Sequence, residues 1–131
     1  MKSISPNLMV YNVDDTVEYY KSYFNFEQVA FLPETGDLQW AMLKNGEVTI
    51  MLQDIDSIRN DIPFFEDIEP GGGFTLFIIV EDVTALYENV RDNVEVISEL
   101  TQTFYGMNEF TIRDLNGYLL TFAERVSEQI D

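Results

Sequence analysis

The residue types that most enzymes use for chemistry are largely missing from this chain. Its 131 residues include no Cys and no His. Without Cys there are no disulfides, thiol nucleophiles, iron–sulfur clusters or zinc–thiolate sites. Without His there are no imidazole ligands for a metal, no Ser-His-Asp triad and no acid–base catalysis by histidine. The residue counts alone therefore exclude much of familiar enzyme chemistry.

One carboxylate, Glu109, is a candidate catalytic residue. Tyr105 precedes it and Arg113 follows it in an alternating stretch. A Glu beside a Tyr can transfer a proton without a metal if the Glu is desolvated. The alternative is an ion pair between Glu109 and Arg113 on one face of the same strand. The sequence leaves both interpretations open.

The hydrophobic pattern predicts a module of four strands and one helix over residues 4–53. Acidic residues at the start of the helix suit its dipole. The dipeptide Asn45-Gly46 predicts a two-residue hairpin turn, because a type I′ turn needs positive φ at both central positions. The predicted strands are 8–10, 26–31, 38–43 and 48–52, and the helix begins at 12–16.

A second module of the same kind is predicted over residues 74–125. The run Val13-Asp14-Asp15 with Tyr20 recurs as Val80-Glu81-Asp82 with Tyr87, at an offset of 67 residues. The turn Asn45-Gly46 recurs as Asn116-Gly117 at an offset of 71. Matching order and spacing indicate an internal duplication. The predicted strands are 74–80, 94–97, 110–112 and 118–122, and the helix begins at 81–83.

Residues 54–73 are predicted to link the two modules within a single domain of residues 1–131. The linker ends in Pro70-Gly71-Gly72-Gly73, which is typical of a hinge. One interpretation is that the acidic linker attracts a cationic ligand and lines its binding site. The other is that it is a solvated loop whose Phe residues fill the junction of the modules. Its six carboxylates stand against Arg59 alone and are interleaved with Ile55, Ile62, Phe64 and Phe65.

Strand alternation predicts one aliphatic core face and one mixed face in each module. In the first hairpin Leu43 should oppose Val48, and in the second Ile112 should oppose Leu120. Met and aromatic groups on the mixed faces suit an adaptable ligand surface, although they would also suit packing between modules. The predicted ligand-binding residues are Asn7, Met9, Tyr11, Trp40, Met42, Thr49, Met51, Thr75, Phe77, Phe104, Tyr105, Glu109, Thr111, Arg113 and Thr121.

Two β-α-β-β-β modules in about 130 residues resemble the vicinal oxygen chelate superfamily of glyoxalase I, extradiol dioxygenases and bleomycin-resistance proteins. The most specific stretches are residues 13–20 and 108–117. The second, flanked by Tyr105-Gly106 and Phe122-Ala123-Glu124, looks most like the bleomycin-resistance branch. The resemblance implies an α+β fold of cupped mixed sheets around a cavity, with helices outside, and a homodimer.

Catalytic members of that superfamily hold a divalent metal with His, Glu or Gln from the first and last strands of each module. The resemblance maps these positions onto Ser5, or Asn7 if the register slips by two, and onto Met51, Thr75 and Thr121. Thioether and hydroxyl groups are poor ligands for such ions. We therefore expect no metal and no other cofactor, as in bleomycin-resistance proteins.

Charge and targeting signals narrow the function further. The net charge is −17, so binding to nucleic acid or an anionic membrane is not expected. No signal core or membrane-spanning run is evident, so a cytoplasmic location is expected. We predict a metal-independent protein that sequesters an aromatic or cationic small molecule such as an antibiotic. Alternatives are a glyoxalase-like lyase or isomerase, or a dioxygenase-type enzyme, with an atypical or metal-free site, and a regulatory homodimer whose cavity takes a peptide.

Overall fold

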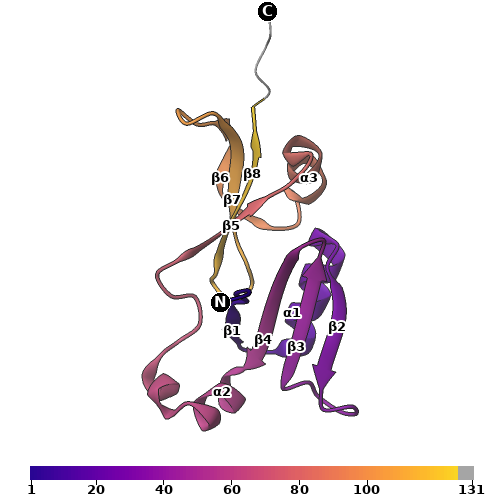
Figure 1. Cartoon of the computed structure of the whole chain (residues 1–131), viewed down its shortest axis with the longest axis vertical. Coiled ribbons are helices and arrows are strands. Elements are labelled where there is room, and N and C mark those ends of the chain that lie inside the picture. The colour runs from indigo at the N-terminus through magenta and orange to yellow at the C-terminus, as the bar shows by residue number, and fades with distance from the viewer. Residues whose placement is uncertain (127–131) are drawn as a thin grey trace, which may run out of the picture. The chain divides into compact units, whose positions relative to one another are not determined.

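The chain forms two compact units, the first spanning Met1–Pro70 and the second beginning at Gly71. A computed structural model describes residues 1–126. Each unit contains one four-stranded mixed sheet with a helix against it (Figure 1). The strand order is β1-β4-β3-β2 in the first unit and β5-β8-β7-β6 in the second. Both units share one β-α-β-β-β topology, which confirms the predicted duplication and the α+β fold class.

The first unit is built around helix α1 (Val13–Phe24). The helix begins where the side chain of Asn12 accepts a hydrogen bond of 2.8 Å from the Asp15 N–H, and it ends at Asn25, whose φ is 56°. Its apolar face packs on β3 and β4, where Tyr20 and Leu43 are fully buried. The strands are β1 (Asn7–Val10), β2 (Glu27–Leu32), β3 (Trp40–Asn45) and β4 (Val48–Asp54).

The second unit is built around helix α3 (Val83–Val90), which contacts β7 and β8. Asp82 caps the helix by accepting a hydrogen bond from the Ala85 N–H. Beneath it the rings of Phe110 and Phe122 stack 5.3 Å apart, and the Tyr87 ring meets Phe110 edge-on at 5.1 Å. The strands are β5 (Thr75–Ile79), β6 (Glu95–Gln102), β7 (Met107–Arg113) and β8 (Leu119–Arg125).

The two hairpins test the predicted registers. In the second, Ile112 pairs with Leu120, as predicted from the sequence. In the first the prediction is wrong by two residues, since Leu43 pairs with Ile50 rather than with Val48. Gly46 and Glu47 are the central residues of that turn, and only Gly46 has positive φ. The Asn45 amide instead donates to the carbonyl oxygens of Phe24 and Asn25 and so closes the end of α1.

The offset of 67 residues predicted for the repeated helices is also wrong. Asn12 and Asp82 are the equivalent caps, which gives an offset of 70. Val80 lies before the helix, whereas its supposed counterpart Val13 is the first helical residue. The similar residues Val13-Asp14-Asp15 and Val80-Glu81-Asp82 therefore occupy different positions of the repeat, although the two units do share one topology.

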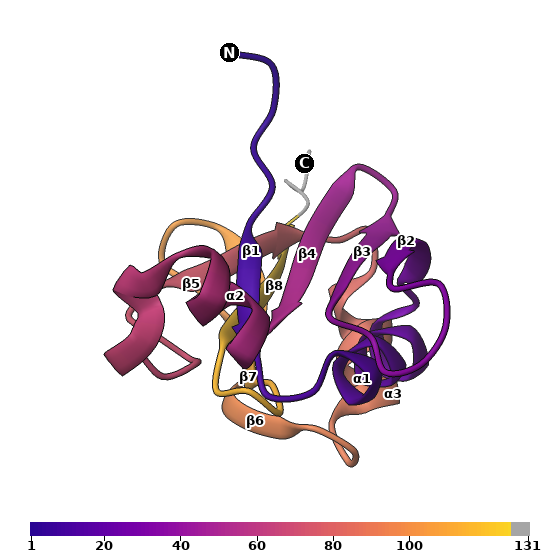
Figure 2. The same ribbon diagram turned by 90° about the horizontal axis from the view of Figure 1, so that it is seen from below.

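The segment predicted as a linker contains structure that the sequence did not reveal. Residues Ile55–Asp61 form helix α2 and Pro63–Asp67 form a 3₁₀ helix, η1. Helix α2 contacts β1 and β4 and buries Ile58, so the segment belongs to the first unit (Figure 2). Phe64, one of the apolar residues interleaved with the carboxylates of this segment, is 79% exposed. Within residues 1–126, no helix is long and apolar enough to cross a membrane.

Removing the Phe110 side chain should destabilise the second unit strongly. Phe110 is fully buried, so Phe110→Ala leaves a cavity and should lower the free energy of unfolding by about 3–5 kcal/mol. The same truncation at the 99% exposed Phe104 should cost less than about 0.5 kcal/mol. Urea denaturation followed by circular dichroism measures both values. Equal losses in the two variants would contradict the assigned core.

Candidate functional site

Each sheet has a face opposite its long helix, which we call the open face. On the second unit the registers arrange this face in rows across neighbouring strands. Side chains in one row lie about 5 Å apart from strand to strand. One row contains Ile79, Ala123, Glu109 and Thr101, the next Phe77, Thr121, Thr111 and Ser98, and the third Thr75, Leu119, Arg113 and Glu95.

The edge strand β5 makes one side of this open face apolar and exposed. Phe77 is 51% exposed and Ile79 is 61% exposed, and they are alternate residues of the strand. Phe77 thus lies on the face that the sequence predicted for it. Large apolar groups exposed side by side are a common mark of a binding surface.

The middle of the face is polar and internally satisfied. The hydroxyl oxygens of Thr111 and Thr121 lie 2.7 Å apart and share a hydrogen bond. Thr121 is buried, and its hydroxyl already has Thr111 as a hydrogen-bond partner. The resemblance would require a metal ligand at this position. This pair offers a ligand a neutral surface rather than a charge.

Glu109 is held by Tyr105, as the sequence suggested. The Tyr105 hydroxyl donates a hydrogen bond of 2.6 Å to Oε1 of Glu109. Acceptance of this bond by Glu109 raises the pKa of the Tyr105 phenol above its ordinary value. Oε2 of Glu109 is buried, and no residue among 1–126 donates a hydrogen bond to it. A buried carboxylate oxygen without a donor is costly and calls for a missing partner.

The ion pair between Glu109 and Arg113, one of the two interpretations left open by the sequence, is not formed, because Arg113 pairs with Glu95. Arg113 lies directly across from Glu95 in the β6–β7 ladder, and their charged atoms are 3.7 Å apart. Glu109 is four residues away along β7, which places it roughly 13 Å from Arg113. Arg113 is nearer to Glu95, its direct neighbour on the adjacent strand, than to Glu109, which lies two rows away on the same strand. Arg113 therefore pairs with Glu95.

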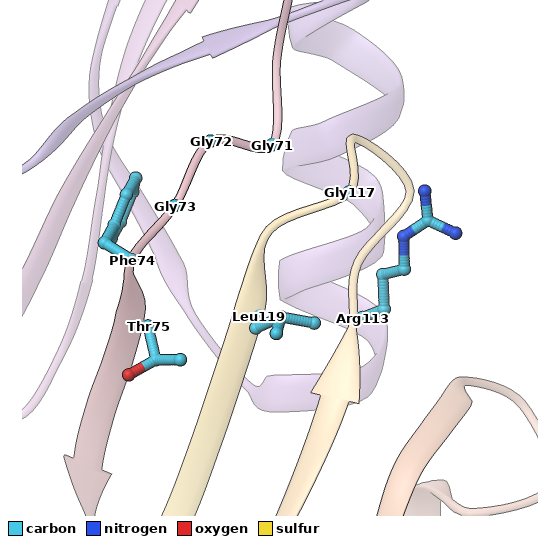
Figure 3. A pocket seen from close by; sticks show the side chains of 8 residues that line it. All are labelled: Gly71, Gly72, Gly73, Phe74, Thr75, Arg113, Gly117 and Leu119. Atoms are coloured by element: carbon cyan, nitrogen blue, oxygen red, sulfur yellow. The ribbon is translucent and has the colours of Figure 1, made fainter.

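A shallow pocket of about 770 Å³ lies at the Arg113 end of the second unit (Figure 3). Its wall is the backbone of residues 71–73 beside the turn at Gly117. A Cβ on Gly71 would meet the backbone of Asn116 and Gly117 at 3.1 Å, and Gly71 has a φ of 98°. Both facts require glycine there. Thr75, Arg113 and Leu119 line the same pocket from neighbouring strands.

The open face of the first unit is partly covered. Trp40, Met42, Thr49 and Met51 are half-buried there, on the face that the sequence predicted. Met9, however, is only 4% exposed, so it is not available at the surface. Helix α2 contacts β1 and β4, the two strands that meet at Met9 and its register partner Gln53.

Gln53 ties α2 to the sheet through both ends of its amide. Its Nε2 donates to Ser57 Oγ at 3.0 Å and to Asp61 Oδ2 at 2.8 Å. Its Oε1 accepts a bond of 2.9 Å from the amide of Asn7. The sequence did not show that Gln53 anchors a helix, because its partners Ser57 and Asp61 lie in α2, which was not predicted.

Two predicted binding residues lie outside the strands. Tyr11 follows the end of β1, and its hydroxyl donates a hydrogen bond of 3.3 Å to Glu69. Phe104 lies with Tyr105 in the turn between β6 and β7, where their rings meet edge-on at 5.1 Å. Arg59 organises the segment around Glu69, because it donates to Glu69 and to the carbonyl oxygens of Phe65 and Ile68.

The strand registers show which positions of the two units are equivalent. The pairs Asn7–Met51 and Thr75–Leu119 are equivalent parallel partners at an offset of 68 residues. The same offset relates Thr121 to Gln53, so Met51 and Thr121, the two last-strand positions that the resemblance assigned, are not equivalent in the repeat. Gln53 is recognised as the counterpart of Thr121 only from the parallel pairing of β1 with β4 and of β5 with β8. The sequence alone does not give these pairings.

The equivalent positions are a poor fit for a catalytic divalent ion, because only Gln53 has a side chain of the types that catalytic members use, and its Oε1 already accepts a hydrogen bond from Asn7. Asn7, Gln53, Thr75 and Thr121 are neutral, and the Asn7, Gln53 and Thr121 side chains are engaged in hydrogen bonds within their own units. Such ions favour carboxylate or imidazole ligands. Across residues 1–126, no three His, Cys, Asp or Glu side chains gather in a group that could hold a metal.

The family of the chain follows from its match to known proteins. The model of the Glyoxalase/Bleomycin resistance protein/Dioxygenase superfamily matches residues 4–122, so the chain belongs to this superfamily. No curated protein matches the chain in sequence.

Solved structures show the same fold at low sequence identity. TioX from Micromonospora sp. ML1 is 20% identical, covers 95% of this chain and 99% of its own, and has a TM-score of 0.75. A glyoxalase/bleomycin resistance protein/dioxygenase from Nocardioides is 15% identical over 100% and 91%, with a TM-score of 0.77. A glyoxalase-related enzyme from Fulvimarina pelagi is 12% identical over 95% and 89%, also with a TM-score of 0.77.

Glu109→Gln should lower the pKa of Tyr105, because the charged acceptor of its hydrogen bond is lost. Absorbance titration of wild type minus Tyr105→Phe isolates this phenol. The folded state holds the phenol proton more tightly than the unfolded state. The contribution of the pair to stability is therefore full below about pH 10 and declines as pH rises through the folded pKa. An unchanged Tyr105 titration in Glu109→Gln would show that the hydrogen bond does not form in solution.

Proposed function

We propose that this protein is a metal-independent binding protein that sequesters an aromatic small molecule on the open face of its second unit. Within its superfamily we propose the bleomycin-resistance-like branch, a cytoplasmic location and a homodimer. The half-buried Trp40, Met42 and Met51 on the open face of the first unit are candidates for the same binding role. We propose binding rather than catalysis because the positions that hold a metal in catalytic relatives carry neutral side chains here.

One observation carries this proposal. The positions at which catalytic relatives hold a metal carry neutral amides and hydroxyls, and three of the four side chains are hydrogen-bonded within their own units. A metal would have to break the Asn7–Gln53 and Thr111–Thr121 bonds and would receive no anionic ligand in return. The chain therefore keeps the fold of the superfamily without the ligands for the divalent metal on which its catalytic members depend.

The exposed edge of the second unit supplies a reason for an aromatic ligand. Phe77 and Ile79 leave apolar surface in water, which costs roughly 25 cal/mol for each Å². A flat apolar compound lying on them removes that surface from water. The neighbouring Thr111–Thr121 pair is neutral and does not oppose such contact.

A second candidate is metal-free proton transfer by Glu109. The 2.6 Å bond from Tyr105 and the buried Oε2 favour it, because catalytic carboxylates are commonly desolvated. A reaction would require a substrate with an acidic proton and a movement of the Glu109 side chain or its neighbours that exposes Oε2. Retention of turnover in Glu109→Gln would exclude this role.

The binding proposal is tested with proflavine, a planar tricyclic cation, and acridone, a neutral compound of similar shape. We expect saturable binding by fluorescence titration and a ligand-dependent rise in melting temperature. EDTA should change neither result. Phe77→Ser should weaken binding about tenfold, because it removes roughly 1.5 kcal/mol of apolar contact. Phe64→Ser, at an exposed position of the first unit, is the matched control and should bind normally.

Two results would contradict the proposal. One is the absence of any binding of either compound at millimolar concentration. The other is binding that appears only when Mn²⁺, Ni²⁺ or Zn²⁺ is added.

A further inference from the structure

A cationic side chain, Arg113, lies at one end of the pocket in the second unit (Figure 3). Its guanidinium packs beside the turn at Gly117. A Cβ on Gly117 would lie 3.6 Å from Nη2 and 3.8 Å from Nε of Arg113, and 3.5 Å from the Cα of Gly71. Gly117 has a φ of 91°, which favours glycine, so no side chain stands between the guanidinium and the backbone of the pocket wall. The charged end of Arg113, rather than its stem, therefore belongs to the pocket.

The guanidinium of Arg113 keeps most of its hydrogen-bonding capacity. It presents several N–H donors in a planar fork. Its ionic partner within residues 1–126 is Glu95, and the 3.7 Å between Nη1 and Oε2 exceeds the roughly 3.2 Å of a well-formed hydrogen bond. Both side chains are more than half exposed, and exposed ion pairs contribute little to stability. An anion that enters the pocket can therefore displace Glu95 or share the guanidinium with it.

The other charged groups around Arg113 are either distant or already hydrogen-bonded. Asp114, the next residue, is buried and accepts hydrogen bonds from two backbone N–H groups of its own turn. On the open face Glu109 is roughly 13 Å away along β7, and Arg125 lies at the far end of β8, roughly 20 Å away. Charges more than about 8 Å apart are largely screened at physiological ionic strength, which limits the effect of the net charge of −17. Charge recognition in the pocket therefore depends on Arg113 and Glu95.

The neighbouring side chains decide which kind of anion fits. Thr75, Leu119 and Arg113 are consecutive across β5, β8 and β7, so Thr75 lies about 10 Å from Arg113. Phe77, 51% exposed, follows Thr75 on the same face of β5. The open face thus offers apolar contact at roughly the length of a bicyclic aromatic ring from the cation. A single guanidinium beside Glu95 matches one negative charge better than the two charges of a phosphate.

We propose that Arg113 binds the carboxylate of an aromatic acid whose ring system lies over Leu119 and Phe77. The planar fork of the guanidinium matches a carboxylate through two parallel hydrogen bonds. Glu95 competes with the ligand for the same cation. This inference rests on the proposed function and assigns to it a class of ligand, an aromatic monocarboxylate, and a residue that recognises its charge.

The first test compares 2-naphthoate with 2-naphthamide, which have the same shape and differ in charge. Both are titrated by fluorescence into the wild type and into Arg113→Gln. The wild type should prefer 2-naphthoate by about tenfold, because the charge-assisted hydrogen bonds require the carboxylate. Arg113→Gln should bind the two compounds equally and keep its affinity for 2-naphthamide.

The second test uses two variants that lose the same negative charge on β6. Glu95→Gln removes the competitor of the ligand, so 2-naphthoate should bind about fivefold more tightly, while 2-naphthamide should bind as before. Glu99→Gln removes an exposed carboxylate elsewhere on the strand and is the matched control. Screening should keep its effect on 2-naphthoate below about twofold.

A third measurement does not depend on a variant that folds. The side-chain Nε–H resonance of Arg113 in the wild type should shift on addition of 2-naphthoate and stay unchanged with 2-naphthamide. Equal binding of the two compounds to the wild type, or a preference that survives in Arg113→Gln, would overturn the inference and leave the proposed function intact. Equal gains in Glu95→Gln and Glu99→Gln would reduce the effect to long-range charge and would also overturn it. If neither naphthalene compound binds while acridone does, the inference alone fails, and if no aromatic compound binds, the proposed function fails with it.

Discussion

Each four-stranded sheet in this protein has one long helix, and one helix covers one face. Helix α1 buries the aliphatic side of the first sheet, where Leu43 and Leu52 are fully shielded, and α3 packs on β7 and β8 of the second. Side chains on the sheet face away from the long helix must then be covered by another segment or remain exposed to solvent. This constraint explains why the chemically interesting residues of both units lie on their open faces.

The two units meet the constraint differently. The first recruits α2, which Gln53 holds against β1 and β4 through Ser57 and Asp61. The corresponding residue of the second unit, Thr121, is too short to anchor a helix and bonds to Thr111 instead. In the second unit Phe77 and Ile79 of the edge strand are exposed, and Ala123 lies between Ile79 and Glu109. On this face of the second unit the edge strand β5 is exposed, whereas Thr121 and Ala123 in the middle of the sheet are buried.

Hydrophobic periodicity predicted all eight strands, the two long helices and the members of each face. The register error in the first hairpin was two residues, and a shift of two keeps every side chain on its face. Helix α2 was missed because it is short and acidic, and its one buried residue, Ile58, gives no periodic signal. The role of Gln53 and the pairing of Arg113 with Glu95 depend on strand registers, which involve residues far apart in the sequence.

The central claim is that the ligand lies on the open face of the second sheet. It is tested most directly by NMR of the protein with ¹³C-labelled isoleucine methyl groups during addition of proflavine. The account predicts that the methyl resonance of Ile79 shifts in proportion to saturation, while that of Ile112, buried on the opposite face, stays in place. Saturable binding that leaves Ile79 unchanged would contradict it.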